Sequence, residues 1–182
     1  MFGSFLLRLR LGSRRRRRPA DILEPMTRRS ETTGEPFDTR LAAYALVEHE
    51  SKVLLTLWDM RHRDARFTPR WSLPGGGVDL GEQATDGVVR EVYEETGYHV
   101  GQLSLLDVST GIIPAAKRYS GDGHPMQTVA VTYRARLLGG QLRHEQDGST
   151  SEAAWFTREE ILGLNRIERV DSILRLTSPG VR

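Results

Sequence analysis

The 182-residue sequence predicts a single domain of the mixed α+β class, preceded by a basic leader. Two observations predict this class. Apolar runs of strand length lie on both sides of one central helical segment, and apolar residues at helical spacing near the end of the sequence predict a second helix. The strict alternation of strands and helices that builds a parallel sheet is absent, and so is any internal repeat. One domain is expected because ~100–150 residues is the usual domain size.

Basic and acidic residues are unevenly distributed along the chain. Residues 1–40 hold ten arginines against five acids, whereas residues 41–182 hold 16 basic residues against 19 acids. We therefore predict a disordered leader and linker over 1–40, with the polar segment 27–38 as the linker, and a domain over 41–182. The run Arg14–Arg18 is expected to make a weak contact with anionic lipid or nucleic acid through phosphate charge.

Composition excludes several classes of protein. The sequence has no cysteine, which rules out disulfide frameworks, thiolate zinc sites and cysteine nucleophiles. No stretch approaches the ~18 consecutive apolar residues of a membrane span, and the leader reverses the order of charges and apolar residues in a secretory signal. A cytoplasmic protein is therefore expected.

The first half of the domain is predicted to contain three strands and a helix. Apolar runs at 41–47 and 53–58, separated by polar residues, predict a β-hairpin. Trp71–Leu73 predicts a short strand that a proline and three glycines end. Residues 82–96 then predict a helix, because three valines at helical spacing share one side of it.

The second half returns to strands and ends on a helix. Strands are predicted at 103–113, 127–138 and 153–156, and a last helix at 166–176. A shorter helix is expected to begin at Thr157, because Glu160 stands three residues later and the pair forms a capping box.

Three carboxylates of the central helix form a candidate metal site. Glu91, Glu94 and Glu95 are spaced i, i+3 and i+4, so at ~100° per residue they fall on one side of the helix and repel one another. A bound cation would relieve this repulsion, and oxygen ligands favour Mg²⁺ or Mn²⁺. Arg90 is placed to pair with Glu94. The alternative is a solvated acidic face with exposed salt bridges.

The segment GGVDLGEQATDGVVREVYEETGY, from Gly76 to Tyr98, resembles the signature box of the Nudix hydrolases. Every glycine, glutamate and arginine of that pattern is present at its spacing. The one departure is Tyr98, where the family generally has an aliphatic residue. The preceding Trp71–Gly77 is similar to the usual lead-in, and the resemblance covers roughly residues 41–165.

This resemblance implies a mixed β-sheet sandwiched between α-helices, with the box as a loop–helix–loop. It also implies an enzyme that cleaves a phosphoanhydride of a nucleotide with metal-activated water. The implied metal ligands are Glu91, Glu94 and Glu95. Arg90 is implied to orient them, Gly76, Gly77 and Gly97 to shape the loops, and Glu82 to support the site.

The general base is left open by the resemblance, because family members use either a box glutamate or a carboxylate from a loop near the last strand. In the second case the candidates are Glu145 and Glu152, ranked above Asp147. Each of the three is equally interpretable as a surface residue.

The substrate is expected to contact residues outside the box. Arg61, Arg63, Arg66 and Arg70 are candidates for phosphate binding, and Trp58 and Phe67 for stacking. The alternative interpretation makes the aromatic residues core and the arginines a solvated loop.

A nucleoside triphosphate, including an oxidised one, and ADP-ribose or a sugar nucleotide are about equally favoured as substrates. A competing hypothesis is a non-catalytic nucleotide sensor or nucleic-acid-associated protein on the same fold, against which the intact carboxylates argue. A homodimer is left open.

Overall fold

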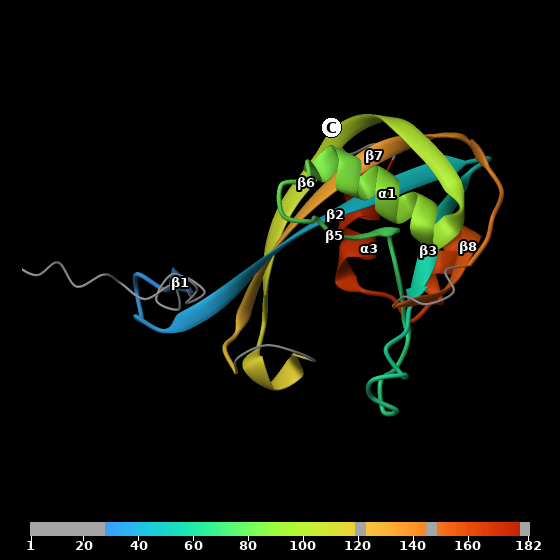
Figure 1. Cartoon of the computed structure of the whole chain (residues 1–182). Helices are drawn as coiled ribbons and strands as arrows, with labels where there is room; N and C mark the ends of the chain where they lie inside the picture. Colours follow the sequence, from blue (N-terminus) through green and yellow to red (C-terminus); the bar gives the residue numbers. More distant parts are fainter. Residues whose placement is uncertain (1–27, 119–122, 145–148, 179–182) are drawn as a thin grey trace, which may run out of the picture.

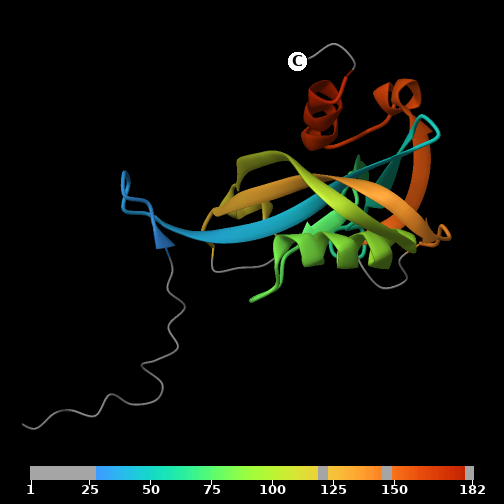
Figure 2. The same ribbon diagram turned by 90° about the horizontal axis from the view of Figure 1, so that it is seen from above.

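The computed structural model describes residues 28–118, 123–144 and 149–178. One mixed sheet lies between two helical layers, as predicted (Figure 1, Figure 2). The strands are β1 (Arg28–Arg29), β2 (Pro36–His49), β3 (Lys52–Trp58), β4 (Arg70–Ser72), β5 (Gly75–Gly77), β6 (Tyr98–Ile113), β7 (Met126–Gly140) and β8 (Thr150–Thr157). The helices are α1 (Ala84–Thr96), α2 (Arg158–Leu162) and α3 (Glu168–Leu176), with a short 3₁₀ helix at Ala115–Lys117.

The strand order is β4-β3-β2-β7-β6, with β1 and β5 also paired to β2 and with β8 paired to β3. Only β2 and β7 run parallel, and every other pair is antiparallel. Figure 2 shows α1 on one face of this sheet and α2 and α3 on the other.

Helix α1 is held by an apolar stripe. Val88 and Val92 are fully buried and pack against Ala43, Ala45 and Leu54 of the sheet. The helix begins at Ala84, two residues later than predicted, and ends where Gly97 takes a left-handed conformation with a φ of 73°. The local pattern therefore predicted the helix and its end correctly.

A close backbone contact fixes the end of α1. A Cβ atom on Gly97 would lie 2.5 Å from the carbonyl oxygen of Gln141, and one on Gly140 would lie 2.4 Å from the carbonyl oxygen of Gly97. The chain leaving α1 and the chain leaving β7 thus touch at a point where neither has room for a side chain.

The second core cluster lies on the opposite face of the sheet. Leu46 and Leu55 pack there against Ile161 of α2 and against Val170 and Ile173 of α3, and all five side chains are fully buried. Helix α2 carries the predicted capping box: the Thr157 side chain accepts from the Glu160 amide, and the Glu160 carboxylate accepts from the Thr157 amide. The last helix is likewise confirmed.

The structure corrects three expectations about strands. The segment expected as a linker forms β1 and the start of β2, which pairs with β7 from Asp38 onward. The glycines at 75–77 form a strand of their own, paired with Ala42–Tyr44. Strand β6 begins at Tyr98, five residues before the predicted start. The start of β2, β5 and β6 pair with partners distant in sequence, which local patterns do not reveal, whereas β1 pairs with β2 as a local hairpin.

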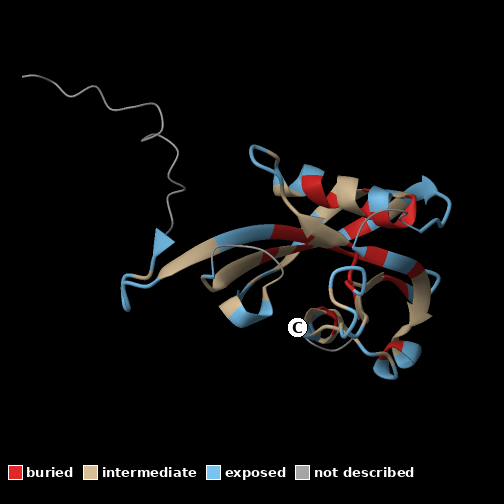
Figure 3. Cartoon of the chain, turned by 60° about the horizontal axis from the view of Figure 1, so that its bottom comes forward, coloured by how far each residue is buried: buried red, intermediate tan, exposed pale blue. Residues whose placement is uncertain are grey.

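The remainder of the predicted leader, including Arg14–Arg18, lies outside the described residues, and the division of the chain into leader and domain stays a prediction. Figure 3 shows the buried residues of β2 inside the body of the molecule, whereas its first six residues project beyond it and are not buried. In the described part of the chain, no helix has the length and apolar character needed to cross a membrane.

Strands β2 and β3 diverge inside the sheet. They pair only at Glu48 with Val53 and at His49 with Lys52. Farther along, β5 has taken the place beside β2, while β4 and β8 flank β3. The sheet is therefore open at the level of β5, directly next to α1.

We predict that Leu54→Ala lowers the free energy of unfolding by about 2–5 kcal/mol, because it leaves a cavity in the cluster under α1. Urea denaturation followed by circular dichroism measures this change. Leu80→Ala is the matched control, since Leu80 is fully exposed and its truncation should change stability by less than ~0.5 kcal/mol. Equal losses in the two variants would show that the cluster does not hold α1.

Candidate active site

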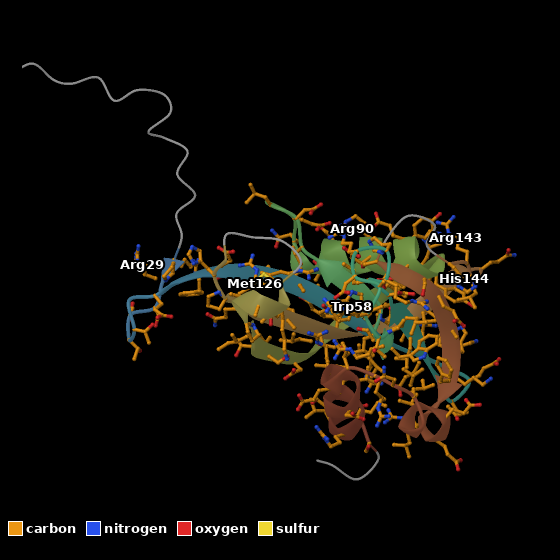
Figure 4. All side chains as sticks on the ribbon, turned by 90° about the horizontal axis from the view of Figure 1, so that it is seen from below. Arg29, Trp58, Arg90, Met126, Arg143 and His144 are labelled. Carbon is orange, nitrogen blue, oxygen red and sulfur yellow. The ribbon has the colours of Figure 1, made fainter. Side chains whose placement is uncertain are left out.

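A cavity of about 980 Å³ lies at the opening of the sheet. The glycines of β5 line it together with Glu91 and Glu95 of α1, and Tyr44 and Trp58 line it from β2 and β3. In Figure 4, Arg90 lies on the α1 layer and Trp58 lies between this layer and α3. Another cavity, of about 1000 Å³, is lined by the β1–β2 hairpin and the ends of β6 and β7, and none of the predicted site residues lines it.

Glu95 is the most constrained carboxylate of the site. Its side chain is buried, with 6% of the residue exposed. One oxygen accepts from the Gly75 amide at 2.9 Å and from the Thr56 hydroxyl at 3.3 Å, and the other accepts from the Thr150 hydroxyl. These donors belong to β5, β3 and β8, so the carboxylate links α1 to three strands. Hydrogen bonds of this kind offset the cost of burying the charge.

Arg90 is the centre of a second network. Its Nε and Nη2 atoms donate to the two oxygens of Glu82, each at 2.9 Å, and Nη2 also donates to the Gly77 carbonyl at 3.1 Å. Its Nη1 atom lies 3.0 Å from Glu91 and 3.0 Å from Glu94. The predicted pairing with Glu94 is present, and the same guanidinium offsets part of the repulsion among the box glutamates.

The Arg90 network changes the titration of Glu82. The hydrogen bonds from Arg90, followed by the one from the Asp79 amide, lower the pKa of Glu82 from 4.5 to about 2. The same contacts, with Glu82 foremost, raise the pKa of Arg90 above its ordinary value. Glu82 therefore stays ionised and fastens the loop before α1 to the helix.

Gly76 allows the loop to approach Glu91 closely. A Cβ atom at Gly76 would lie 2.7 Å from Oε2 of Glu91, well inside van der Waals contact. The carboxylate thus rests directly on the backbone of β5, and any side chain at this position would displace it. This close approach gives a physical reason for the glycine.

The three box glutamates do not share one environment. Glu91 and Glu95 line the cavity, whereas the Glu94 side chain is about half exposed, at 48%, and does not line it. The interpretation as a solvated acidic face thus suits Glu94 alone. No three acidic or histidine side chains within the described ranges lie close enough together to form a metal site as they stand.

Of the predicted substrate residues, Trp58 lines the cavity, and Phe67 and Arg70 contact Trp58. The Phe67 ring packs edge-on with its centroid 4.8 Å from that of Trp58, and the Arg70 guanidinium lies 5.2 Å from the Trp58 ring centroid. Arg61 pairs with Asp59, Arg66 pairs with Asp64, and Arg63 is exposed. None of these four arginines lines the cavity, and their part in substrate binding stays a prediction.

None of the loop carboxylates predicted as a general base is placed in the cavity by the described part of the structure. Glu152 lies on β8 opposite Leu57, is exposed and does not line the cavity. Glu145 and Asp147 lie outside the described residues.

Tyr98, the departure from the box pattern, has a packing role. Its hydroxyl accepts a hydrogen bond from the Trp155 indole at 3.2 Å, and the two rings meet edge to face. It therefore packs against the core cluster under α1.

Several residues of the site escaped sequence reasoning. Thr56 and Thr150 bind Glu95 from strands 39 and 55 residues away, and isolated threonines in strands carry no signal of such a role. Tyr44 stood inside an apolar run, Arg40 was assigned to the leader, and Arg169 lay outside the apolar stripe of α3. All five line the cavity.

Comparison with known proteins finds relatives over part of the chain. An RNA pyrophosphohydrolase from Bartonella quintana is 42% identical over 102 residues, which are 55% of this chain and 54% of that protein. An ADP-ribose pyrophosphatase from Methanocaldococcus jannaschii is 29% identical over 113 residues, 62% of this chain and 59% of that protein. The chain thus spans little more than half the length of these curated relatives.

Solved structures share the fold. A MutT NUDIX hydrolase from Burkholderia pseudomallei superposes with a TM-score of 0.62 at 24% identity, over 78% of this chain and 99% of that one. The sequence model of the NUDIX domain matches residues 38–176, from the last residue of the predicted linker through α3. The match covers most of the chain and contains the box with its loop, its helix and both glutamates of the cavity wall, so this chain belongs to the Nudix family.

Proposed function

We propose that this chain hydrolyses a phosphoanhydride bond of a nucleotide, with water as the nucleophile and Mg²⁺ as the cofactor. The observation that carries the proposal is the position of Glu91 and Glu95 on the wall of a cavity of about 980 Å³, beside the glycines of β5. This volume is at the upper end of the range of ~300–1,000 Å³ usual for small-molecule sites.

The donors on this wall fit a hard divalent cation. They are carboxylate oxygens, with no sulfur or imidazole among the box residues, and hard cations prefer such ligands. Glu91 and Glu95 would hold the ion from the wall, and Glu94, which does not line the cavity, is the third proposed ligand. When bound, it would act as a Lewis acid and offset the charge on the phosphates. Mn²⁺ has the same ligand preference and is the natural substitute.

The protein side of the site has two tasks. Glu95 is kept in place by donors from three strands, so its orientation does not depend on the helix alone. Arg90 positions Glu91 and Glu94 through one guanidinium nitrogen, while its other nitrogens bind Glu82 and the Gly77 carbonyl. We assign Arg90 as a positioning residue. The general base remains a choice among a box glutamate, Glu145 and Glu152.

The relatives support a nucleotide substrate without choosing one. One is named as an RNA pyrophosphohydrolase and the other as an ADP-ribose pyrophosphatase. A nucleoside triphosphate and ADP-ribose or a sugar nucleotide therefore remain the two proposed classes. The competing hypothesis is a nucleotide-binding protein without catalysis, and the intact carboxylates of the wall argue against it. A homodimer and the contact by Arg14–Arg18 stay predictions.

We predict that the chain releases phosphate products from at least one nucleotide in the presence of Mg²⁺, and that EDTA abolishes this turnover. Glu95→Gln should lower kcat/KM at least ~100-fold, because losing a metal-site carboxylate costs more than losing a supporting hydrogen bond. Glu94→Gln should also lower it.

Glu159→Gln on α2 is the control, since its exposed carboxylate lies outside the cavity and its turnover should be unchanged. Chromatographic separation of products measures each rate. Cleavage of none of the nucleotides, or full activity in both box variants, would favour the non-catalytic hypothesis.

The Arg90–Glu82 pair makes stability depend on pH. The pKa of Glu82 is about 2 in the folded protein, below its ordinary value of 4.5, so the pair stabilises the fold above about pH 4.5. This stabilisation decreases as pH falls below 4.5 and is lost as pH falls through about 2, below which the carboxylate is protonated in both states.

Urea midpoints between pH 7 and pH 2 should therefore fall less in Glu82→Gln than in the parent protein, and the two curves should converge at the acid end. Glu159→Gln should follow the parent. A parallel fall in all three proteins would show that Glu82 and Arg90 are not coupled.

A further inference from the structure

The wall of the cavity formed by α3 carries positive charge. Arg169, Ser172 and Arg175 line it from this helix, and Arg40 lines it from β2. Glu168 is the one acid that α3 contributes, and Asp107 of β6 also lines the cavity. Three guanidinium groups thus line the same cavity as Glu91 and Glu95. Helices α1 and α3, which supply most of these charges, lie on opposite faces of the sheet (Figure 2).

Arg169 is held in a defined orientation without an acceptor. Its Cζ atom lies 3.8 Å from the centroid of the Tyr44 ring, so the guanidinium stacks on the ring. Within the described part of the chain, its Nε atom is shielded from solvent and has no hydrogen-bond partner. A buried donor without an acceptor costs free energy, so this geometry is favourable when a ligand supplies one.

A short chain of contacts connects Arg169 to the cavity wall that holds Glu95. Tyr44 on β2 pairs directly with Gly75 on β5, and the Gly75 amide donates to Glu95. Paired residues of antiparallel strands stand ~4.5–5.5 Å apart at Cα. Tyr44, on which Arg169 stacks, is therefore the cross-strand neighbour of Gly75, whose amide binds Glu95.

Arg175 has a supporting place on the same helix. It lies six residues, less than two turns, beyond Arg169, and its Nη2 atom donates to the Ser172 hydroxyl at 3.2 Å. A fork of N–H donors from a stacked guanidinium, with a hydroxyl and a second guanidinium beside it, matches the oxygens of a phosphate group better than a neutral base or sugar.

We propose that Arg169, oriented by Tyr44 and assisted by Arg175, binds a phosphate of the substrate that is not the one attacked beside Glu91 and Glu95. The inference rests on the proposed function and sharpens it: the cavity holds the phosphates of the anhydride between an acidic wall on α1 and a basic wall on α3. Arg169 binds this phosphate and takes no part in proton transfer.

Calorimetric titration with inorganic pyrophosphate in EDTA tests the proposal without turnover. The full chain is compared with Arg169→Gln and Arg175→Gln, and with Arg136→Gln as the control. Arg136 is an exposed arginine of β7 whose guanidinium donates to Gln102 away from the cavity. Thermal unfolding of each variant checks that the fold is intact.

Arg169→Gln should weaken pyrophosphate binding about 10–100-fold, in line with the loss of charge-assisted hydrogen bonds. Arg175→Gln should weaken it less, and Arg136→Gln should leave it unchanged. Arg169→Lys should recover part of the affinity, because it keeps the charge and loses the stacked fork. Equal affinities in the parent and Arg169→Gln, or no binding by the parent, would overturn the proposal.

A kinetic measurement separates this inference from the proposed function. For whichever nucleotide is cleaved, Arg169→Gln should raise KM at least tenfold and change kcat less than about threefold. An unchanged KM in an active enzyme overturns the inference and leaves the hydrolase proposal standing. Weakened pyrophosphate binding by Arg169→Gln in a chain that cleaves nothing supports the phosphate site and refutes the hydrolase.

Discussion

The buried carboxylate of Glu95 is the interaction on which the site depends. A charge with so little exposure is tolerated only when donors surround it, and here one amide and two hydroxyls come from three different strands. Because Glu95 lies on α1, these bonds fix the helix relative to β3, β5 and β8. The position of the neighbouring Glu91, and the shape of the cavity wall, follow from that arrangement.

The opening between β2 and β3 explains why opposite charges meet in one cavity. A continuous sheet would keep α1 and α3 on separate faces, each with its own core cluster. Since the two strands pair only near Glu48 and His49, a passage remains through which both helices reach the same space. The net charge of −3 over residues 41–182 is thus a poor guide to the site, because the cavity places Glu91 and Glu95 on its α1 wall and Arg169 and Arg175 on its α3 wall.

Sequence reasoning succeeded where the signal was local. The helix of the box, its glutamate spacing and the Thr157–Glu160 capping box each lie within a few residues, and all are present in the structure. It failed where the partner is distant. The threonines that bind Glu95, the glycine strand β5 and the stacking of Arg169 on Tyr44 arise from chain crossings that no periodicity records.

The contact between Gly97 and Gly140 has a consequence for how the site tolerates change. At Gly140 the obstructing atoms are backbone atoms of Gly97 and Tyr98, whereas at Gly97 the Arg143 side chain obstructs together with the carbonyl oxygen of Gln141. A flexible side chain can shift to accept a new neighbour, so Gly140 is the position that a side chain could occupy only if the backbone moved. The end of α1 that carries Glu94 and Glu95 thus has a backbone contact with the end of β7 in addition to the apolar stripe that holds the helix on the sheet.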